Sequence, residues 1–346
     1  MPIHSIRGWL VILKQHRFEV VAGVVLAGLI GAWAMSVRLQ LDGLGVPAEC
    51  VDNWLGRVDQ GGVPESCHGP MRAYAGILGG AGSMLVGEGF LPWSAMGLLP
   101  FAIGLLGGTP LVAAELEART TSTAWTLSPS RTRWLLRQAA PVAFVLGIGA
   151  AIAAVAASGV VAAEVEWGHS AFYYVGLHGP LALVRSFAAF GIGLLIGAVI
   201  GRTLPALAVG AAVSVAVLFG VAAAREAWLG TLEARPIARI SAVTGELVME
   251  SRAETTDWGW IAPDGKIFPL QDALTLVPRE IYDHDDHIQY TDSSTWLAGQ
   301  GYVSTPLGVM HEQAMGWQPY EALLFGSLGV ALVGSTVLVV NRRRPG

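Results

Sequence analysis

Six apolar stretches of about 20 residues constrain this chain more than any other feature of its sequence. About 20 helical residues cross the ~30 Å hydrocarbon core of a bilayer. A lipid-facing backbone must satisfy its hydrogen bonds within its own segment, and a barrel would show alternating ten-residue patterns instead. With 53% hydrophobic and 14% charged residues, the sequence predicts an all-α polytopic membrane protein. The six predicted crossings are 18–37, 94–114, 140–163, 181–201, 204–224 and 319–340.

Basic residues gather on one side of these crossings, and this asymmetry predicts their orientation. The positive-inside bias places that side, with both termini, in the cytoplasm. A seventh crossing at 73–91 would move the basic C-terminal tail outside, so we expect this Gly-rich stretch to be an outer amphipathic or partly inserted helix. The basic residues of the inner side are Arg7, Lys14, Arg17, Arg119, Arg131, Arg133, Arg137, Arg202, Arg342, Arg343 and Arg344.

The crossings divide the chain into parts of different character. The N-terminal part is expected to be an amphipathic helix on the inner membrane surface, because it combines apolar residues with Arg7, Lys14 and Arg17; an unstructured basic tail is the alternative. The apolar run after it is longer than that of a signal peptide, so no cleavable signal is expected. The segment before the last crossing is acidic and rich in turns, with Pro263-Asp264-Gly265 between apolar runs, which predicts a small α+β extracellular domain. The predicted parts are the connecting helix 1–17, crossings one to five in 18–224 with an outer loop 38–93 and a cytoplasmic loop 115–139, the extracellular domain 225–318, and the sixth crossing with its basic tail 319–346.

Two small sets of residues predict local contacts. Cys50 and Cys67 both fall in the outer loop, where an oxidising compartment favours a disulfide over two free thiols. Gly193, Gly197 and Gly201 recur every fourth residue, which places them on one helix face and lets a neighbouring backbone approach closely. Ordinary helix packing is the default interpretation of the glycines, and a dimer interface is the alternative.

The sequence lacks the motifs of several common catalytic and nucleotide-binding sites. The sequence has no GxxxxGK[ST] phosphate-binding loop, no GxSxG nucleophile motif and no HExxH zinc pair. Ionisable residues also look nearly absent from the interior of the crossings, which argues against a proton pump or an intramembrane protease. The segment 283–287 holds Asp and His, but its spacing matches no recognised zinc motif, so a solvated acidic loop is the preferred interpretation.

The inner loop 115–139 is a polar island between two apolar segments. Glu115 and Glu117 extend from the inner end of the second crossing, and Ser128-Pro129 is predicted to supply the N-cap and first position of the next helix. A partner that binds this loop could therefore move two helices at once. Taken alone, the arginines of the loop are better explained as interfacial charges that flank membrane helices, whereas the combined motif favours a docking role for Glu115, Glu117 and Thr120.

The order of residues in this loop resembles the first intracellular loop of ABC-2 type ABC-transporter permeases, most closely the actinobacterial permease subunits. The resemblance is carried by Pro110-Leu111-Val112-Ala113-Ala114-Glu115-Leu116-Glu117, then Thr120, then Ala124-Trp125-Thr126, then Ser130-Arg131-Thr132-Arg133-Trp134-Leu135. The cysteine pair and Arg202-Thr203-Leu204-Pro205-Ala206 agree with it. The chain departs at Arg119, where the family usually has Gly before Thr.

The resemblance implies a permease subunit that is not an enzyme by itself and has no catalytic, cofactor-binding or metal-binding residues of its own. It would work with two separate P-loop ATPase subunits, which bind ATP and Mg, and with a second permease copy or a paralogue. It would sit in the bacterial cytoplasmic membrane, bind no nucleic acid, and export a hydrophobic or amphipathic compound such as a drug, antibiotic, lipid or peptide. The implied coupling residues are Glu115, Glu117, Arg119, Thr120, Thr121, Trp125, Ser130, Arg131 and Arg133.

Two other classes of function stay open at this point. One is a sensor or immunity module, in which the outer domain binds a ligand and the loop signals to a cytoplasmic partner without net transport. The other is a membrane-embedded enzyme acting on lipid, with the 283–287 cluster as its metal site. The substrate, the choice between homodimer and heterodimer, and the role of the outer domain are not encoded in any motif.

Overall fold

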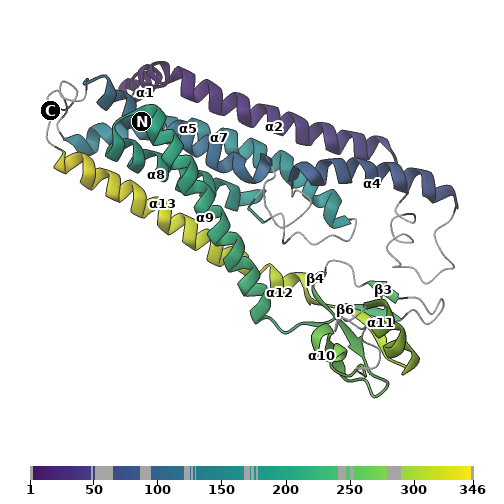
Figure 1. Cartoon of the computed structure of the whole chain (residues 1–346). Helices are drawn as coiled ribbons and strands as arrows, with labels where there is room; N and C mark the ends of the chain where they lie inside the picture. Colours follow the sequence, from purple (N-terminus) through teal and green to yellow (C-terminus); the bar gives the residue numbers. More distant parts are fainter. Residues whose placement is uncertain are drawn as a thin grey trace.

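The computed structural model of the chain describes residues 3–47, 50, 65–85, 95–120, 125, 128, 130–166, 172, 175–176, 178–240, 247–249, 253–278 and 290–343. Six helices within these ranges are long and apolar enough to cross a membrane, which confirms the predicted polytopic all-α architecture. Figure 1 shows them side by side, with both chain termini at the same end of the bundle. The six are α2 (Arg17–Gly43), α5 (Ala95–Glu117), α7 (Arg131–Glu166), α8 (Gly179–Ile200), α9 (Thr203–Thr231) and α13 (Trp317–Arg342).

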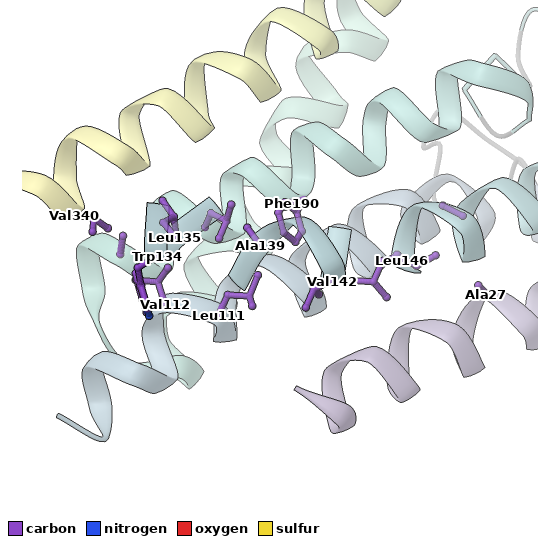
Figure 2. Packing of buried hydrophobic residues seen from close by; sticks show 14 of the residues in the cluster. Ala27, Leu111, Val112, Trp134, Leu135, Ala139, Val142, Leu146, Phe190 and Val340 are labelled. Atoms are coloured by element: carbon purple, nitrogen blue, oxygen red, sulfur yellow. The ribbon is translucent and has the colours of Figure 1, made fainter. Parts of the chain in front are cut away.

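Helices α5 and α8 form the centre of the bundle. In the most apolar 18-residue stretch of each helix, 78% of α5 and 61% of α8 is buried, compared with 22% of α9 and of α13. Helices α9 and α13 are therefore the outermost of these helices. Glycines allow the central pair to pack backbone to backbone: a Cβ on Gly104 of α5 would lie 2.4 Å from the carbonyl oxygen of Ser186. Figure 2 shows the adjoining core, in which Leu111 and Val112 of α5 and Trp134 and Leu135 of α7 pack beside Val340 of α13.

A second core joins α2, α7 and α4 (Glu65–Leu85) at the end of the bundle away from the termini. Cys50 and Cys67 form a disulfide there, with their Cα atoms 5.4 Å apart, and both are buried against Met71 and Tyr74 of α4. A loop of 17 residues closed in this way stabilises the fold by about 3 kcal/mol in the chain-entropy model. Helix α4 is not among the six helices that the described residues offer as membrane spans.

The chain between α9 and α13 forms a small strand domain at the end of the bundle opposite the termini (Figure 1). Its described strands make an antiparallel sheet in the order β1-β6-β4-β5 and a two-stranded ribbon β2-β3. Trp260, Ala273, Val277 and Leu297 form its core. Its elements are β1 (Arg235–Pro236), β2 (Ala238–Ile240), β3 (Leu247–Met249), β4 (Ala253–Ile261), β5 (Ile267–Pro269), α10 (Leu270–Leu274), α11 (Tyr290–Gly299), β6 (Val303–Met310) and α12 (His311–Ala314).

The predicted turn at Pro263-Asp264-Gly265 connects β4 to β5. The Gly265 N–H donates to the Ala262 carbonyl at 2.8 Å, and Gly265 takes a φ of +86°, a conformation that side chains disfavour. Asp264 accepts a hydrogen bond from the Lys266 N–H at 3.0 Å. The turn residues therefore close this hairpin by the mechanism that their sequence predicts.

Candidate functional site

Helix α5 ends in a tight turn at the end of the bundle that carries both termini, here called the basic end. The Thr120 N–H donates to the Glu115 carbonyl at 3.1 Å and the Arg119 N–H donates to the Leu116 carbonyl at 3.2 Å. This pair of bonds is a Schellman motif, whose left-handed position is usually Gly. Arg119 occupies that position with a φ of +57°. The turn therefore forms in this chain although a non-glycine residue occupies its left-handed position, a conformation that such a residue adopts at a cost.

The two glutamates at the end of α5 join it to other helices. A Glu117 carboxylate oxygen accepts the Thr203 N–H at 3.0 Å, so Glu117 caps the first turn of α9 from another helix. Glu115 accepts a hydrogen bond from Gln15 at 2.6 Å, at the end of α1 (Ile3–Gln15), and a second from the Thr120 hydroxyl. A displacement of the end of α5 would therefore act directly on α1 and α9.

Two tryptophans and an arginine pack where the loop enters α7. The indole of Trp125 is 9% exposed, and its ring meets that of Trp134 edge to face with centroids 6.2 Å apart. The Arg131 guanidinium stacks on Trp125 at 4.4 Å from the ring centroid, a favourable cation–π arrangement. Burial of one large aromatic side chain thus anchors the middle of the loop against α7.

The same arginine holds the C-terminal end of α13. Arg131 Nη1 donates to the carbonyl oxygens of Val340 at 3.2 Å and Asn341 at 3.1 Å, and also to that of Arg343. These carbonyls lack partners within the helix, so a cation placed there satisfies them and complements the helix dipole. Arg343 in turn donates to the Ala198 carbonyl near the end of α8.

Helix α7 begins two residues later than its sequence predicts. The prediction of Ser128 as N-cap and Pro129 as the first helical residue is wrong, because Ser130 is the cap: its hydroxyl accepts the Arg133 N–H at 3.1 Å, and the helix starts at Arg131. The Ser128 hydroxyl donates to the Ser130 carbonyl at 3.1 Å. The Arg133 side chain is exposed, and Thr121 lies outside the described residues.

The basic end is therefore a connected surface to which α1, α5, α7, α8, α9 and α13 all contribute. Of the predicted coupling residues, Glu115, Glu117, Trp125 and Arg131 make the contacts that join these helices, and Thr120 closes the turn at the end of α5. Nothing in the geometry resembles a catalytic constellation in the described part of the chain. The arrangement offers mechanical coupling: a displacement of the loop between α5 and α7 would also act on α1, α9 and α13.

The predicted glycine face lies inside the protein. A Cβ on Gly193 would lie 2.8 Å from the Thr109 nitrogen of α5, and one on Gly197 would lie 2.5 Å from the Thr109 carbonyl oxygen. Gly201 ends α8 with a φ of +68° next to Arg343 and Leu116. The structure thus places these glycines at contacts within one chain.

The sequence prediction missed a group of ionisable side chains at the other end of the bundle. Near the ends of the predicted crossings, Arg185 of α8 and Glu321 of α13 form a buried ion pair, and Arg225 of α9 contacts the same carboxylate at 3.2 Å. An arginine four residues into an apolar segment was the available signal, because an ionisable residue there is costly without a partner. Its partner, 136 positions away, cannot be read from sequence spacing.

The candidate metal cluster at 283–287 lies outside the described residues. Within the described ranges, no group of three or more His, Cys, Asp or Glu side chains could hold a metal ion. The membrane-enzyme alternative therefore receives no support from the described part of the chain.

Fold and site together define a class: a polytopic membrane protein with a connected polar surface at one end and a small strand domain at the other. Comparison with known proteins agrees. Residues 84–225, which run from the end of α4 through the basic-end loop to the last turns of α9, match the family described as ABC-2 membrane transporter related. This match confirms the resemblance of the chain to ABC-2 type permeases over these residues. No curated protein and no solved structure matches the chain.

Members of this family are transporter membrane subunits rather than catalysts, and they generally work with ATPase subunits. The match covers the loop from Glu115 to Arg133 but not the strand domain. The family match therefore covers α5, α7, α8 and most of α9, and it leaves out α1, α2 and α13.

Proposed function

We propose that this chain is the permease subunit of an ATP-driven exporter in the cytoplasmic membrane of a bacterium, with both termini in the cytoplasm. Two P-loop ATPase subunits would bind the basic end, and a second permease copy or a paralogue would complete the transporter. The chain would bind no cofactor, and ATP with Mg would sit on the ATPase subunits.

One observation carries this proposal: the α5–α7 loop is bonded to the ends of other helices. Glu117 caps α9, Glu115 bonds to α1, and Arg131 holds the end of α13. An ATPase that moves the loop would therefore move α5 and α7 together with α1, α9 and α13. Binding energy at one site biases the state of a distant site only through such differential contacts.

An apolar pocket of the bundle supports a hydrophobic or amphipathic substrate. A cavity of about 400 Å³ lies between α5, α7 and α8, a volume within the range of small-molecule sites. Ile103, Phe144, Phe187 and Phe190 are among its lining residues, and it is almost entirely apolar. Its single polar side chain, Ser186, already donates its hydroxyl to the Ala182 carbonyl at 2.9 Å.

Substitution of Glu117 tests the proposal. Glu117→Ala removes the bond between α5 and α9, so the complex should assemble and keep its basal ATP hydrolysis but lose the stimulation of hydrolysis by transported compound. Glu226→Ala is the matched control, because Glu226 is an exposed glutamate near the opposite end of α9. Unchanged stimulation in Glu117→Ala would overturn the coupling role, and partner activation without any movement of compound would favour the sensor alternative.

A further inference from the structure

Glu321 is the centre of a buried polar network at the end of the bundle next to the strand domain. Its Oε1 accepts Arg185 Nε at 2.8 Å and Arg185 Nη2, while its Oε2 accepts Trp317 Nε1 at 2.7 Å and Arg225 Nη2 at 3.2 Å. Each carboxylate oxygen thus has two donors. We call Arg185, Arg225 and Glu321 the junction network.

The junction network joins three helices, and most of its surface is buried. Arg185 is 3% exposed and Glu321 is fully buried, while the Arg225 side chain keeps 12% of its surface exposed. An aromatic ring lies beside each guanidinium group. The Arg185 guanidinium carbon lies 5.6 Å from the centroid of the Phe325 ring, and that of Arg225 lies 5.5 Å from the centroid of the Phe172 ring. Buried charges of this kind are costly, and apolar residues of similar volume often stabilise a protein as well or better. Stability alone therefore does not account for three charged groups here.

A tight backbone segment covers the network. Gly176 has a φ of +86°, and a Cβ on it would lie 1.9 Å from the Arg185 guanidinium carbon, so only glycine fits against this side chain. The Val175 carbonyl accepts a bond from Arg225 Nη2 at 3.4 Å. The segment before α8 is therefore shaped around the arginines.

The network also lies beside the attachment of the strand domain. Phe172 packs in one cluster with Leu229 of α9, Val309 of β6 and Ala314 of α12. Trp317, which donates to Glu321, is packed against the same cluster. The junction network and the packing cluster that attaches the strand domain are thus linked through Trp317. A shift of α13 relative to α8 would therefore displace both.

Helix α13 is held by arginines at both of its ends. At the basic end Arg131 binds its last carbonyls, and at the other end Arg185 and Arg225 bind Glu321 in its second turn. Packed helices have discrete arrangements rather than a continuum, which makes a helix held at both ends suited to pass on a displacement. Figure 1 shows α13 running the length of the bundle from the C-terminus to the strand domain.

We propose that Arg185, Arg225 and Glu321 are positioning residues for transport: they hold the strand domain in one orientation on the membrane helices and pass to it movements of α13 that begin at the basic end. The transport part of this inference rests on the proposed function. The orientation part does not, because it concerns contacts within this chain alone.

A fully apolar variant separates positioning from stability. Arg185→Met, Arg225→Met and Glu321→Leu together remove all three charges, leave no buried charge unpaired, and should not lower the melting temperature. The control is Arg38→Met with Asp42→Leu, which removes an exposed ion pair within α2.

Spin labels on the purified chain in nanodiscs measure the orientation directly. Asp264, exposed at the β4–β5 turn, and Leu324, half-exposed on α13, are suitable label sites. We expect one narrow distance distribution in the native chain and in the control, and a broad or shifted one in the apolar variant. An unchanged distribution in a stably folded apolar variant would overturn the inference, whatever the partners of the chain prove to be.

ATP hydrolysis by the assembled transporter tests transmission. We expect the apolar variant to keep basal hydrolysis and to lose at least about 5-fold in stimulation by transported compound, the lower end of typical coupling between sites. If the apolar variant keeps full stimulation but shows a broadened distance distribution, the network does not pass movements of α13 to the strand domain. Its role in orienting the strand domain would still be supported. Absence of any stimulation in the native complex would count against the proposed function, and the distance measurement would still decide the orientation role.

Discussion

Arg131 should control how firmly the end of α13 is attached to the loop between α5 and α7. Arg131→Met keeps much of the aliphatic stem but removes the guanidinium that donates to the carbonyls of Val340 and Asn341 and stacks on Trp125. The amides at the end of α13, including the Arg343 N–H that donates to Val339 at 3.0 Å, should then open more often.

The size of the effect follows from the lost contacts. Hydrogen bonds that involve a charged group contribute about 1.5–3 kcal/mol, and a cation–π contact at a partly exposed site about 0.5–1 kcal/mol. Because Arg131 is only half-buried, a combined loss near the low end, about 2 kcal/mol, is expected. Since every 1.4 kcal/mol is a factor of ten, amide exchange in the last turn of α13 should rise about 30-fold.

Hydrogen exchange read by mass spectrometry on the chain in nanodiscs measures this change. Arg133→Met is the matched control, because Arg133 is the same residue type two positions on, with an exposed side chain. The reasoning would be refuted by equal exchange at the end of α13 in the two variants. A general rise in exchange throughout α7 would instead indicate damage to the start of that helix.

Three further changes have expected outcomes. Arg119→Gly should raise the free energy of unfolding by about 0.5–1 kcal/mol, measured by thermal shift. The left-handed conformation costs a non-glycine residue ~1–2 kcal/mol, which exceeds the ~0.5–1 kcal/mol entropic cost of glycine. A loss of stability would contradict the turn assignment. Gly197→Ala should cost about 1–3 kcal/mol, since its Cβ would meet the Thr109 carbonyl oxygen at 2.5 Å, whereas Gly220→Ala, with open space around it, should be neutral. Burial holds the pKa of His16 below its ordinary value of 6.5, so below pH 6.5 the unfolded chain binds more protons than the folded chain and stability should decrease. His16→Gln should therefore reduce the dependence of the melting temperature on pH. An unchanged dependence in this variant would exclude His16 as its source.

The crossings were predictable from sequence because length and apolarity decide whether a helix can span a bilayer. Helix ends were less predictable, since hydropathy reports the hydrocarbon region and not the last hydrogen bond. Helix α9 ends at Thr231, seven residues after the end of the predicted crossing 204–224. Helix α7 begins at Arg131, nine residues before the start of the predicted crossing 140–163. Both extensions carry polar residues that the apolar pattern excludes.

Contacts between distant residues explain the remaining differences. The sequence marks Glu117 as part of a loop motif, but its bond to Thr203 depends on how the ends of α5 and α9 meet. Arg185 and Glu321 each look isolated in an apolar run, and only the packing of α8 against α13 makes them a pair. For Ser130, the error came from local competition, because two serines two positions apart both satisfy the preference for an N-cap.

The most direct test of the account is to isolate the chain from its native membrane and measure ATP hydrolysis by what co-purifies. The account predicts a stoichiometric P-loop ATPase in the preparation, hydrolysis that rises with an amphipathic compound, and loss of that rise in Glu117→Ala with the ATPase still bound. A preparation without an ATPase, in a detergent that preserves known transporter complexes, would contradict the central claim.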